Sequence, residues 1–186
     1  MPRPAETNLA YAFWAEDYVR AGWTPYLLTF MFQPLGGPAH EVARAMEREV
    51  ERVYATVLPR IVRHPTRPAM VGRLPVWFCA LDRPVYKRAK TSLRDVVVND
   101  GLHAHAAAFV PPWSRMPEDL ATHFDLERGR YLRPDCGLLR LDAVRITRRV
   151  GYVVDYVRKL TGRDVFGEDA SFVLPRALSE VQDRAA

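Results

Sequence analysis

Several features that would assign this protein to a class are absent from its sequence. Cysteine occurs only 2 times in 186 residues, as Cys79 and Cys136, at a spacing that indicates neither a zinc site nor a disulfide framework. No apolar run approaches the roughly 18 residues that cross a bilayer, and the first residues lack a basic-then-apolar signal. No Gly-x-x-x-x-Gly-Lys-Ser/Thr loop occurs. We therefore expect a cytoplasmic protein with free thiols, no membrane partner and no P-loop.

Lysine is also scarce, although the chain is basic overall. The 27 Lys and Arg residues exceed the 22 Asp and Glu residues, which gives a formal net charge of +5. Only three of the basic residues, Lys87, Lys90 and Lys159, are lysines. The excess positive charge favours an anionic partner, of which nucleic acid is the commonest, and a solvated basic surface is the alternative.

The length and the apolar content fit a single globular domain, 1–186, of which 48% is hydrophobic. Apolar runs predict strands at 26–32, 75–81, 103–110 and 138–147. Helical spacing predicts helices at 8–20, 40–58, 148–160 and 174–182, and residues 113–136 are expected to be irregular with one turn near 118–123. This order predicts an α+β fold, in which a central antiparallel sheet carries helices on one face.

Two histidines stand two residues apart in one of the predicted strands. Residues two apart in a strand point to the same face, so His103 and His105 project together. The Asn99-Asp100-Gly101 sequence just before them is typical of a hairpin turn. Two imidazoles on one rigid strand form half of a divalent metal site, and the rest of the chain has to supply a third ligand.

The helix that follows the last predicted strand carries two tyrosines and a lysine on one face. Tyr152, Tyr156 and Lys159 lie at positions i, i+4 and i+7. A tyrosine hydroxyl attacks phosphorus when a metal polarises the phosphate and a cation stabilises the developing charge. Together with His103 and His105, these residues predict one site for phosphoryl transfer. The alternative is that the tyrosines are core residues with their hydroxyls at the rim.

Three ordered motifs resemble those of the HUH endonucleases, which include rolling-circle replication initiators, relaxases and single-tyrosine transposases. Tyr26-Leu-Leu-Thr-Phe30 resembles the first motif, His103-Ala-His105 the second, and Asp155-Tyr-Val-Arg-Lys159 the third, Tyr-x-x-Lys. The resemblance covers about residues 24–162 and leaves 163–186 as a C-terminal extension. It implies a ferredoxin/RRM-like fold in which the histidines lie on a middle strand of the antiparallel sheet and face the catalytic helix.

The resemblance also implies an activity. A Mg²⁺ or Mn²⁺ ion held by the histidines would activate a phosphate of single-stranded DNA at an origin or hairpin, and Tyr156 would form a 5′-phosphotyrosine link near the cationic Lys159. Tyr152 would be a second tyrosine for successive cuts. Such nicking and rejoining initiates rolling-circle replication of phage or plasmid-like elements. Because the chain lacks a P-loop, unwinding would need a host helicase.

Three aspartates are candidates for the third metal ligand. In HUH endonucleases this ligand is usually an acidic or polar residue a little upstream of the histidines, and Asp95, eight residues before His103, is the first choice. Asp100 and Asp82 are the alternatives. Any of the three can instead be a turn or surface residue.

Basic residues near the motifs predict a track for single-stranded DNA, with Trp77 or Trp113 available for base stacking. A solvated surface is the simpler interpretation of such a cluster. The basic residues are Lys87, Arg88, Lys90, Arg94, Arg145, Arg148, Arg149 and Arg158.

Two other functions are compatible with the sequence. The same fold can serve as a non-cleaving DNA-binding module for origin recognition or repression. A His-x-His motif also occurs in unrelated barrel metallohydrolases, but those enzymes need far more chain than 186 residues. A third ligand near the histidines and a solvent-reachable Tyr156 would favour the nuclease.

Overall fold

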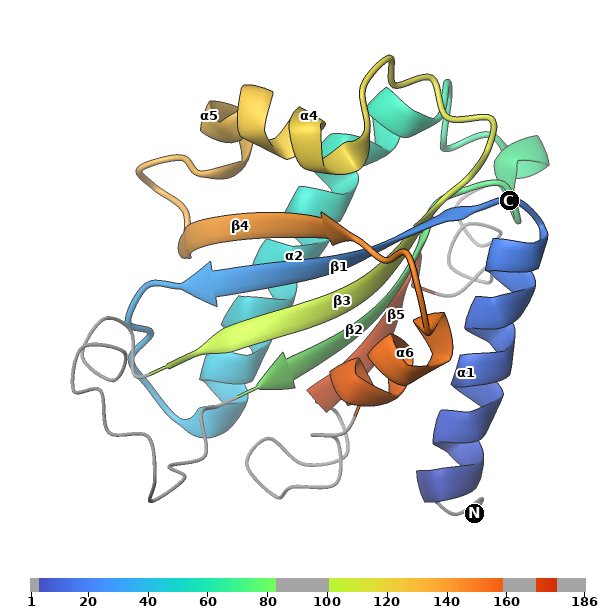
Figure 1. Ribbon diagram of the computed structural model, residues 1–186. Helices are drawn as coiled ribbons and strands as arrows, with labels where there is room; N and C mark the ends of the chain where they lie inside the picture. The colour runs from blue at the N-terminus through green and yellow to red at the C-terminus, as the bar shows by residue number, and fades with distance from the viewer. Residues whose placement is uncertain (1–3, 83–100, 159–169, 177–186) are drawn as a thin grey trace.

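The computed structural model describes residues 4–82, 101–158 and 170–176 (Figure 1). The helices are α1 (Pro4–Arg20), α2 (Ala39–Ile61), the 3-10 helix η1 (Pro68–Met70), α4 (Leu120–Leu126), α5 (Arg128–Tyr131) and α6 (Val150–Arg158). The strands are β1 (Thr24–Phe32), β2 (Val76–Asp82), β3 (His103–Val110), β4 (Leu138–Arg145) and β5 (Ser171–Leu174).

The described strands form a sheet in the order β4-β1-β3-β2-β5, and each neighbouring pair is antiparallel. β3 has β1 on one side and β2 on the other, so it lies in the middle of the sheet (Figure 1). The predicted α+β fold with a central antiparallel sheet is confirmed, and the strand that carries both histidines is its middle strand.

One face of the sheet packs on α2. Apolar residues recur along this helix at helical spacing, so Val42, Met46 and Val50 share one side and are buried. On β3, Ala104 and Ala106 face the same core and are both 0% exposed. Their short side chains leave room for the longer side chains of the helix, which fill the layer between helix and sheet.

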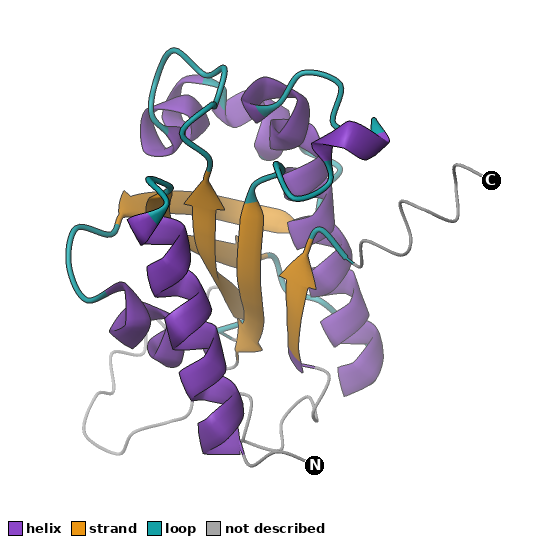
Figure 2. Ribbon diagram, turned by 90° about the vertical axis from the view of Figure 1, so that its right-hand side faces the viewer, coloured by secondary structure: helices purple, strands orange, loops and turns teal. Residues whose placement is uncertain are grey.

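The opposite face packs on α1 and α6, so helices cover both faces of the sheet and not the single face that the element order predicted (Figure 2). Ala15 of α1 and Val154 and Val157 of α6 are buried against Phe78 of β2 and Phe109 of β3. In β2 and β3 the side chains on both faces of the sheet are mostly apolar, so helices have to cover both faces.

The prediction for the C-terminal segment was wrong at Leu174. This residue was expected to begin a helix, but it ends β5, which pairs with Trp77–Ala80 of β2. The remainder of that predicted helix from residue 177 lies outside the described residues. A strand of four residues is too short to show a period, and its conformation here is set by the free edge of β2 that it joins.

The segment expected to be irregular is more helical than the sequence indicated. It contains α4 and α5, and α4 begins at a residue typical of helix starts, because the Asp119 carboxylate accepts hydrogen bonds from the backbone N–H groups of Ala121 and Thr122. No helix in the described ranges combines the length and the apolar character that a membrane crossing requires.

Candidate metal centre

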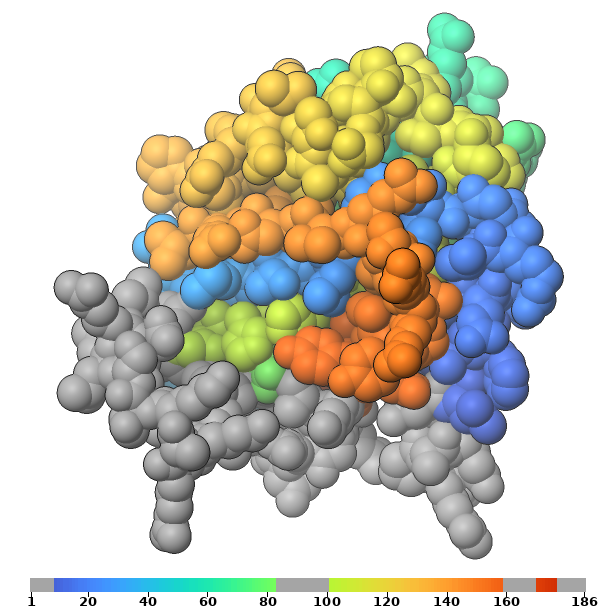
Figure 3. Space-filling model, in the orientation of Figure 1, coloured from blue at the N-terminus to red at the C-terminus, as the bar shows by residue number. Residues whose placement is uncertain are grey.

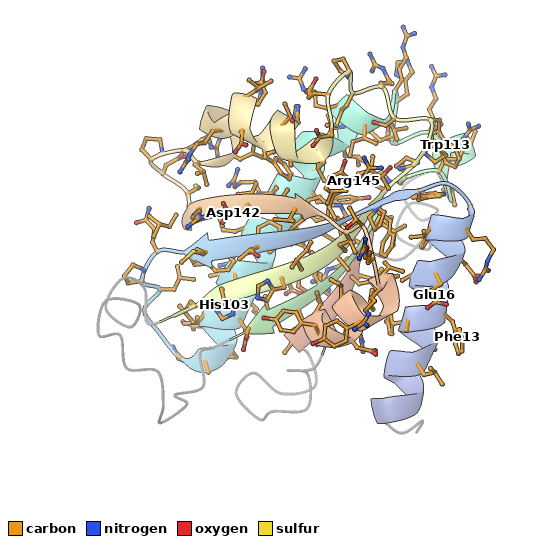
Figure 4. The ribbon with its side chains drawn as sticks, in the orientation of Figure 1. Phe13, Glu16, His103, Trp113, Asp142 and Arg145 are labelled. Carbon is orange, nitrogen blue, oxygen red and sulfur yellow. The ribbon has the colours of Figure 1, made fainter. Side chains whose placement is uncertain are left out.

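The register of three strands brings two histidines and an aspartate together on the α6 side of the sheet. β2 pairs with β3 so that Asp82 lies opposite His103 and Ala80 opposite His105. From the other side, β1 places Thr29 opposite His105. Ligand atoms of Asp82, His103 and His105 lie within 4.8 Å of one another, and we call these three residues the metal centre. Figure 4 shows its position at the end of β3, where His103 is labelled.

The His103 ring is held between a backbone oxygen and a carboxylate. Its Nδ1 lies 2.7 Å from the Gly101 carbonyl oxygen, which can only accept, so Nδ1 carries a proton. Its Nε2 lies 3.0 Å from Oδ2 of Asp82. Burial lowers the pKa of His103, but the hydrogen bonds to Asp82 and Gly101, with the charge of Asp82, outweigh burial and raise the pKa above its ordinary value. A cation bound between Nε2 and Asp82 would replace the proton they share.

The His105 ring contacts the neighbouring strand β1. Its Nδ1 lies 3.2 Å from the Thr29 hydroxyl oxygen, and its ring centroid lies 5.0 Å from that of His103. Burial, followed by the charge of His103, lowers the pKa of His105, and the smaller opposing effects of Asp82 and the Leu28 carbonyl do not reverse this. His105 is therefore neutral at pH 7, which is the state in which an imidazole binds a metal.

The three donors fit a divalent metal ion. Two imidazole nitrogens and one carboxylate oxygen are a recurrent ligand set that leaves positions for water or substrate. The side chains of His103 and Asp82 are only 24% and 14% exposed, so these ligands are already partly desolvated. Mg²⁺ prefers sets made of oxygen, whereas imidazole suits transition-metal ions. The two imidazoles therefore favour a transition-metal ion over Mg²⁺.

α6 brings Tyr156 next to the metal centre. The centroid of the Tyr156 ring lies 5.7 Å from the centroid of the His105 ring. This distance is well below a helix diameter of about 10 Å, so the two side chains belong to one site. Tyr156 is 46% exposed, and Tyr152, one turn earlier, is 67% exposed. A phenol accessible to solvent thus lies beside two imidazoles and a carboxylate.

Arg158, expected to line a DNA track, is instead buried between α1 and α6. It is 8% exposed, and its guanidinium carbon lies 3.8 Å from the centroid of the Tyr11 ring. Burial lowers the pKa of Arg158 and the contacts with Tyr11 oppose this. Nearby, a Cβ added at Gly151 of α6 would lie 3.5 Å from Cβ of Ala12, so the helices also approach closely there. These contacts hold α6, and with it Tyr156, against α1.

The structure describes some of the other predicted site residues. Arg145, Arg148 and Arg149 are exposed at the junction of β4 and α6. Of the three candidate third ligands, Asp82 is described, and it belongs to the metal centre. The predicted residues outside the described ranges are Lys87, Arg88, Lys90, Arg94, Asp95, Asp100 and Lys159.

The two tryptophans proposed for base stacking lie in different environments. Trp77 is 0% exposed and packs against Tyr54 in the core beneath α2, so no base can reach it. Trp113 is 39% exposed, with Arg73 over its ring. It lies at the opposite end of the sheet from His103 (Figure 4). Of this pair, only Trp113 is available for stacking.

Several neighbours of the metal centre were not predicted. Thr29 contacts His105, and although it belongs to the Tyr26–Phe30 motif, that motif predicted no role for it at the site. Asp142 of β4 lies opposite Thr29, and its Oδ2 lies 2.7 Å from Nε of Arg140. Polar residues two apart on β4 indicate that these side chains share one face. Their place beside the metal centre depends on the strand order.

No family model, curated protein or solved structure matches this chain. The antiparallel α+β sheet and the cluster of Asp82, His103 and His105 are compatible with an HUH motif. Because fold alone does not imply function, the activity has to be argued from the site.

Proposed function

We propose that the protein is a metal-dependent HUH-type endonuclease that nicks and rejoins single-stranded DNA through a 5′-phosphotyrosine intermediate, and that it initiates rolling-circle replication of a phage or plasmid-like element. The observation that carries this proposal is the approach of Tyr156 to a ligand set of two histidines and one aspartate, with 5.7 Å between the ring centroids of Tyr156 and His105.

Asp82, His103 and His105 would hold the ion, Mn²⁺ or Mg²⁺. When bound, such an ion polarises a phosphate ester and stabilises the charge that develops on its oxygens. The chain contributes a ligand set whose orientation is fixed in advance. The Gly101 carbonyl keeps the His103 proton on Nδ1, so Nε2 is directed at Asp82.

Tyr156 is the nucleophile. Its hydroxyl oxygen attacks phosphorus, the bond between phosphorus and the 3′ oxygen breaks, and the tyrosine proton ends on the released 3′-hydroxyl. The phosphotyrosine ester retains the energy of the cut bond, so attack by the 3′-hydroxyl reseals the strand without ATP. Lys159, three residues after Tyr156 in the sequence, would supply the cation, and Tyr152 is available for a second cut.

A surface beside the metal centre can receive the DNA strand. α6 packs over β2 and β3, and atoms of β1, β3 and β4 remain uncovered next to it (Figure 3). On this face of β4, Val144 is 63% exposed, and the charge of Arg140 is paired with that of Asp142. The formal net charge of +5 favours a polyanionic substrate.

The test is formation of a covalent adduct. Single-stranded oligonucleotides of mixed sequence carry the label at the 3′ end, because the fragment on that side of the cut stays attached to the tyrosine. After incubation with Mn²⁺, a denaturing gel separates free DNA from the adduct. Tyr156→Phe and His103→Ala are expected to abolish the adduct. The matched controls, Tyr152→Phe and Asp142→Asn, alter the same helix face and the same sheet face and should retain it.

The outcomes separate the competing functions. An adduct lost in Tyr156→Phe and retained in Tyr152→Phe supports the proposal. Loss in Tyr152→Phe alone would keep the chemistry but contradict the choice of nucleophile. Binding of the oligonucleotides without an adduct, with Mn²⁺ and in a parallel incubation with Mg²⁺, would favour the non-cleaving DNA-binding module.

A further inference from the structure

We propose that Thr29 is a positioning residue of the metal centre: its hydroxyl accepts a hydrogen bond from Nδ1–H of His105 and thereby directs Nε2 of His105 at the metal ion. The proposal rests on the metal centre of the proposed function, and its test needs neither DNA nor nicking.

Thr29 is fixed relative to His105 by the sheet itself. The two residues are directly opposite in the β1–β3 ladder, and their side chains point to the same face. Thr29 Oγ1 lies 3.2 Å from Nδ1 of His105. The backbone on both sides of this contact is paired, since β1 lies between β3 and β4. The contact is therefore held by strand register and not by a flexible loop.

The direction of this hydrogen bond decides whether His105 can bind a metal. If Nδ1 donates to the hydroxyl, Nε2 keeps its lone pair and is a ligand. If the hydroxyl donates to Nδ1, the proton lies on Nε2 and that position is closed. In His103, Nδ1 already donates, because its partner is the backbone carbonyl oxygen of Gly101, which can only accept. The same arrangement at His105 leaves both Nε2 atoms available to one ion beside Asp82.

A second oxygen near the His105 ring is an alternative to the Thr29 hydroxyl as the group that fixes the ring. The backbone carbonyl of Leu28 is also close enough to the His105 ring to raise its pKa. If that carbonyl alone fixed the ring, removal of the Thr29 hydroxyl would have no effect on metal binding. The proposal requires that the hydroxyl matters.

The first measurement is the tautomer of His105 in the metal-free wild-type protein, read from imidazole ¹⁵N chemical shifts at a pH where the ring is neutral. The second is the affinity for Mn²⁺ by isothermal titration calorimetry. The variants are Thr29→Val, which keeps the shape and removes the hydroxyl, and Thr29→Ser, which restores it. Thr56→Val is the matched control, because the Thr56 hydroxyl donates to the Arg52 carbonyl on α2, away from the metal centre.

In the wild-type protein we expect the His105 proton on Nδ1. In Thr29→Val we expect Mn²⁺ to bind about tenfold more weakly, which is the lower end of the loss in affinity seen when a group that orients a metal ligand is removed. Thr29→Ser and Thr56→Val should bind within about threefold of wild type. A proton on Nε2, wild-type affinity in Thr29→Val, an equal loss in Thr29→Ser, or no Mn²⁺ binding by wild type would each overturn the proposal. If Thr29→Val fails to fold, Thr29→Ala, which also removes the hydroxyl, takes its place with the same expected loss. Absence of a DNA adduct would contradict the nuclease and leave this result standing.

Discussion

Replacement of Asp82 by asparagine tests the metal centre without any metal or DNA. In the metal-free protein, the Asp82 carboxylate accepts a hydrogen bond from protonated His103 across 3.0 Å. A hydrogen bond to a charged group contributes about 1.5–3 kcal/mol to stability. Solvent reaches 24% and 14% of the two side chains, so we expect about 1–2 kcal/mol. For a domain of this size, that corresponds to a fall in Tm of about 2–8 °C.

The effect of Asp82→Asn should depend on pH in a defined direction. The pKa of His103 is raised in the folded protein, so the pair contributes its full stability below the unfolded pKa, about 6.5, and loses it as pH rises through the folded value. The variant should therefore lose most stability near about pH 5.5 and little near about pH 8.5. Without Asp82, the pKa of His103 should fall.

Thermal unfolding at both pH values, in the presence of a chelator, measures this difference. Asp142→Asn is the control, because Asp142 pairs with an exposed arginine, Arg140, and surface pairs contribute about 0–1 kcal/mol. An equal loss of Tm at both pH values in Asp82→Asn would refute the reasoning, since it would show that Asp82 acts by packing and not through the charge of His103.

Two further predictions concern buried contacts of the fold outside the metal centre. Arg158→Ala should lower the free energy of unfolding by about 2 kcal/mol in chemical denaturation, because it removes the desolvated guanidinium from the Tyr11 ring. The control Arg20→Ala, which removes an exposed ion pair, should change the free energy of unfolding little. Equal effects of the two variants would contradict a stabilising role of the Arg158–Tyr11 contact. Tyr131→Phe should cost about 1–3 kcal/mol in the same assay, because the buried Nε2 of His123 loses its partner at 2.9 Å. A value near zero would show that this hydrogen bond contributes nothing to stability.

The strands and the longer helices could be predicted from the sequence because their signals are local. Apolar runs marked β1 to β4, and the spacing of Val42, Met46 and Val50 marked α2. The placement of His103 and His105 on one face of a strand follows from the two-residue period alone. The α+β class therefore needed no structure, whereas the approach of Tyr156 to the histidines was implied by the resemblance to HUH endonucleases and not by these local signals.

The place of Asp82 beside the histidines could not be predicted, because it depends on which strands are neighbours. Asp95 was the first choice because it is near the histidines in sequence, whereas Asp82 is 21 residues before His103 and lies opposite it in the β2–β3 ladder. The same applies to Thr29, which reaches His105 across 76 residues of chain. A single sequence carries the period of each strand but not the register between strands.

The sequence by itself determined the local elements and the chemical types at the site: two imidazoles on a strand, a phenol on a helix and an excess of positive charge. Only the tertiary structure decided that Arg158 is a buried contact between α1 and α6, that Leu174 belongs to an edge strand, and that Asp82 completes the metal centre. The physical reason is that periodicity is a property of a few consecutive residues, whereas burial, strand order and ligand geometry arise from packing between distant segments.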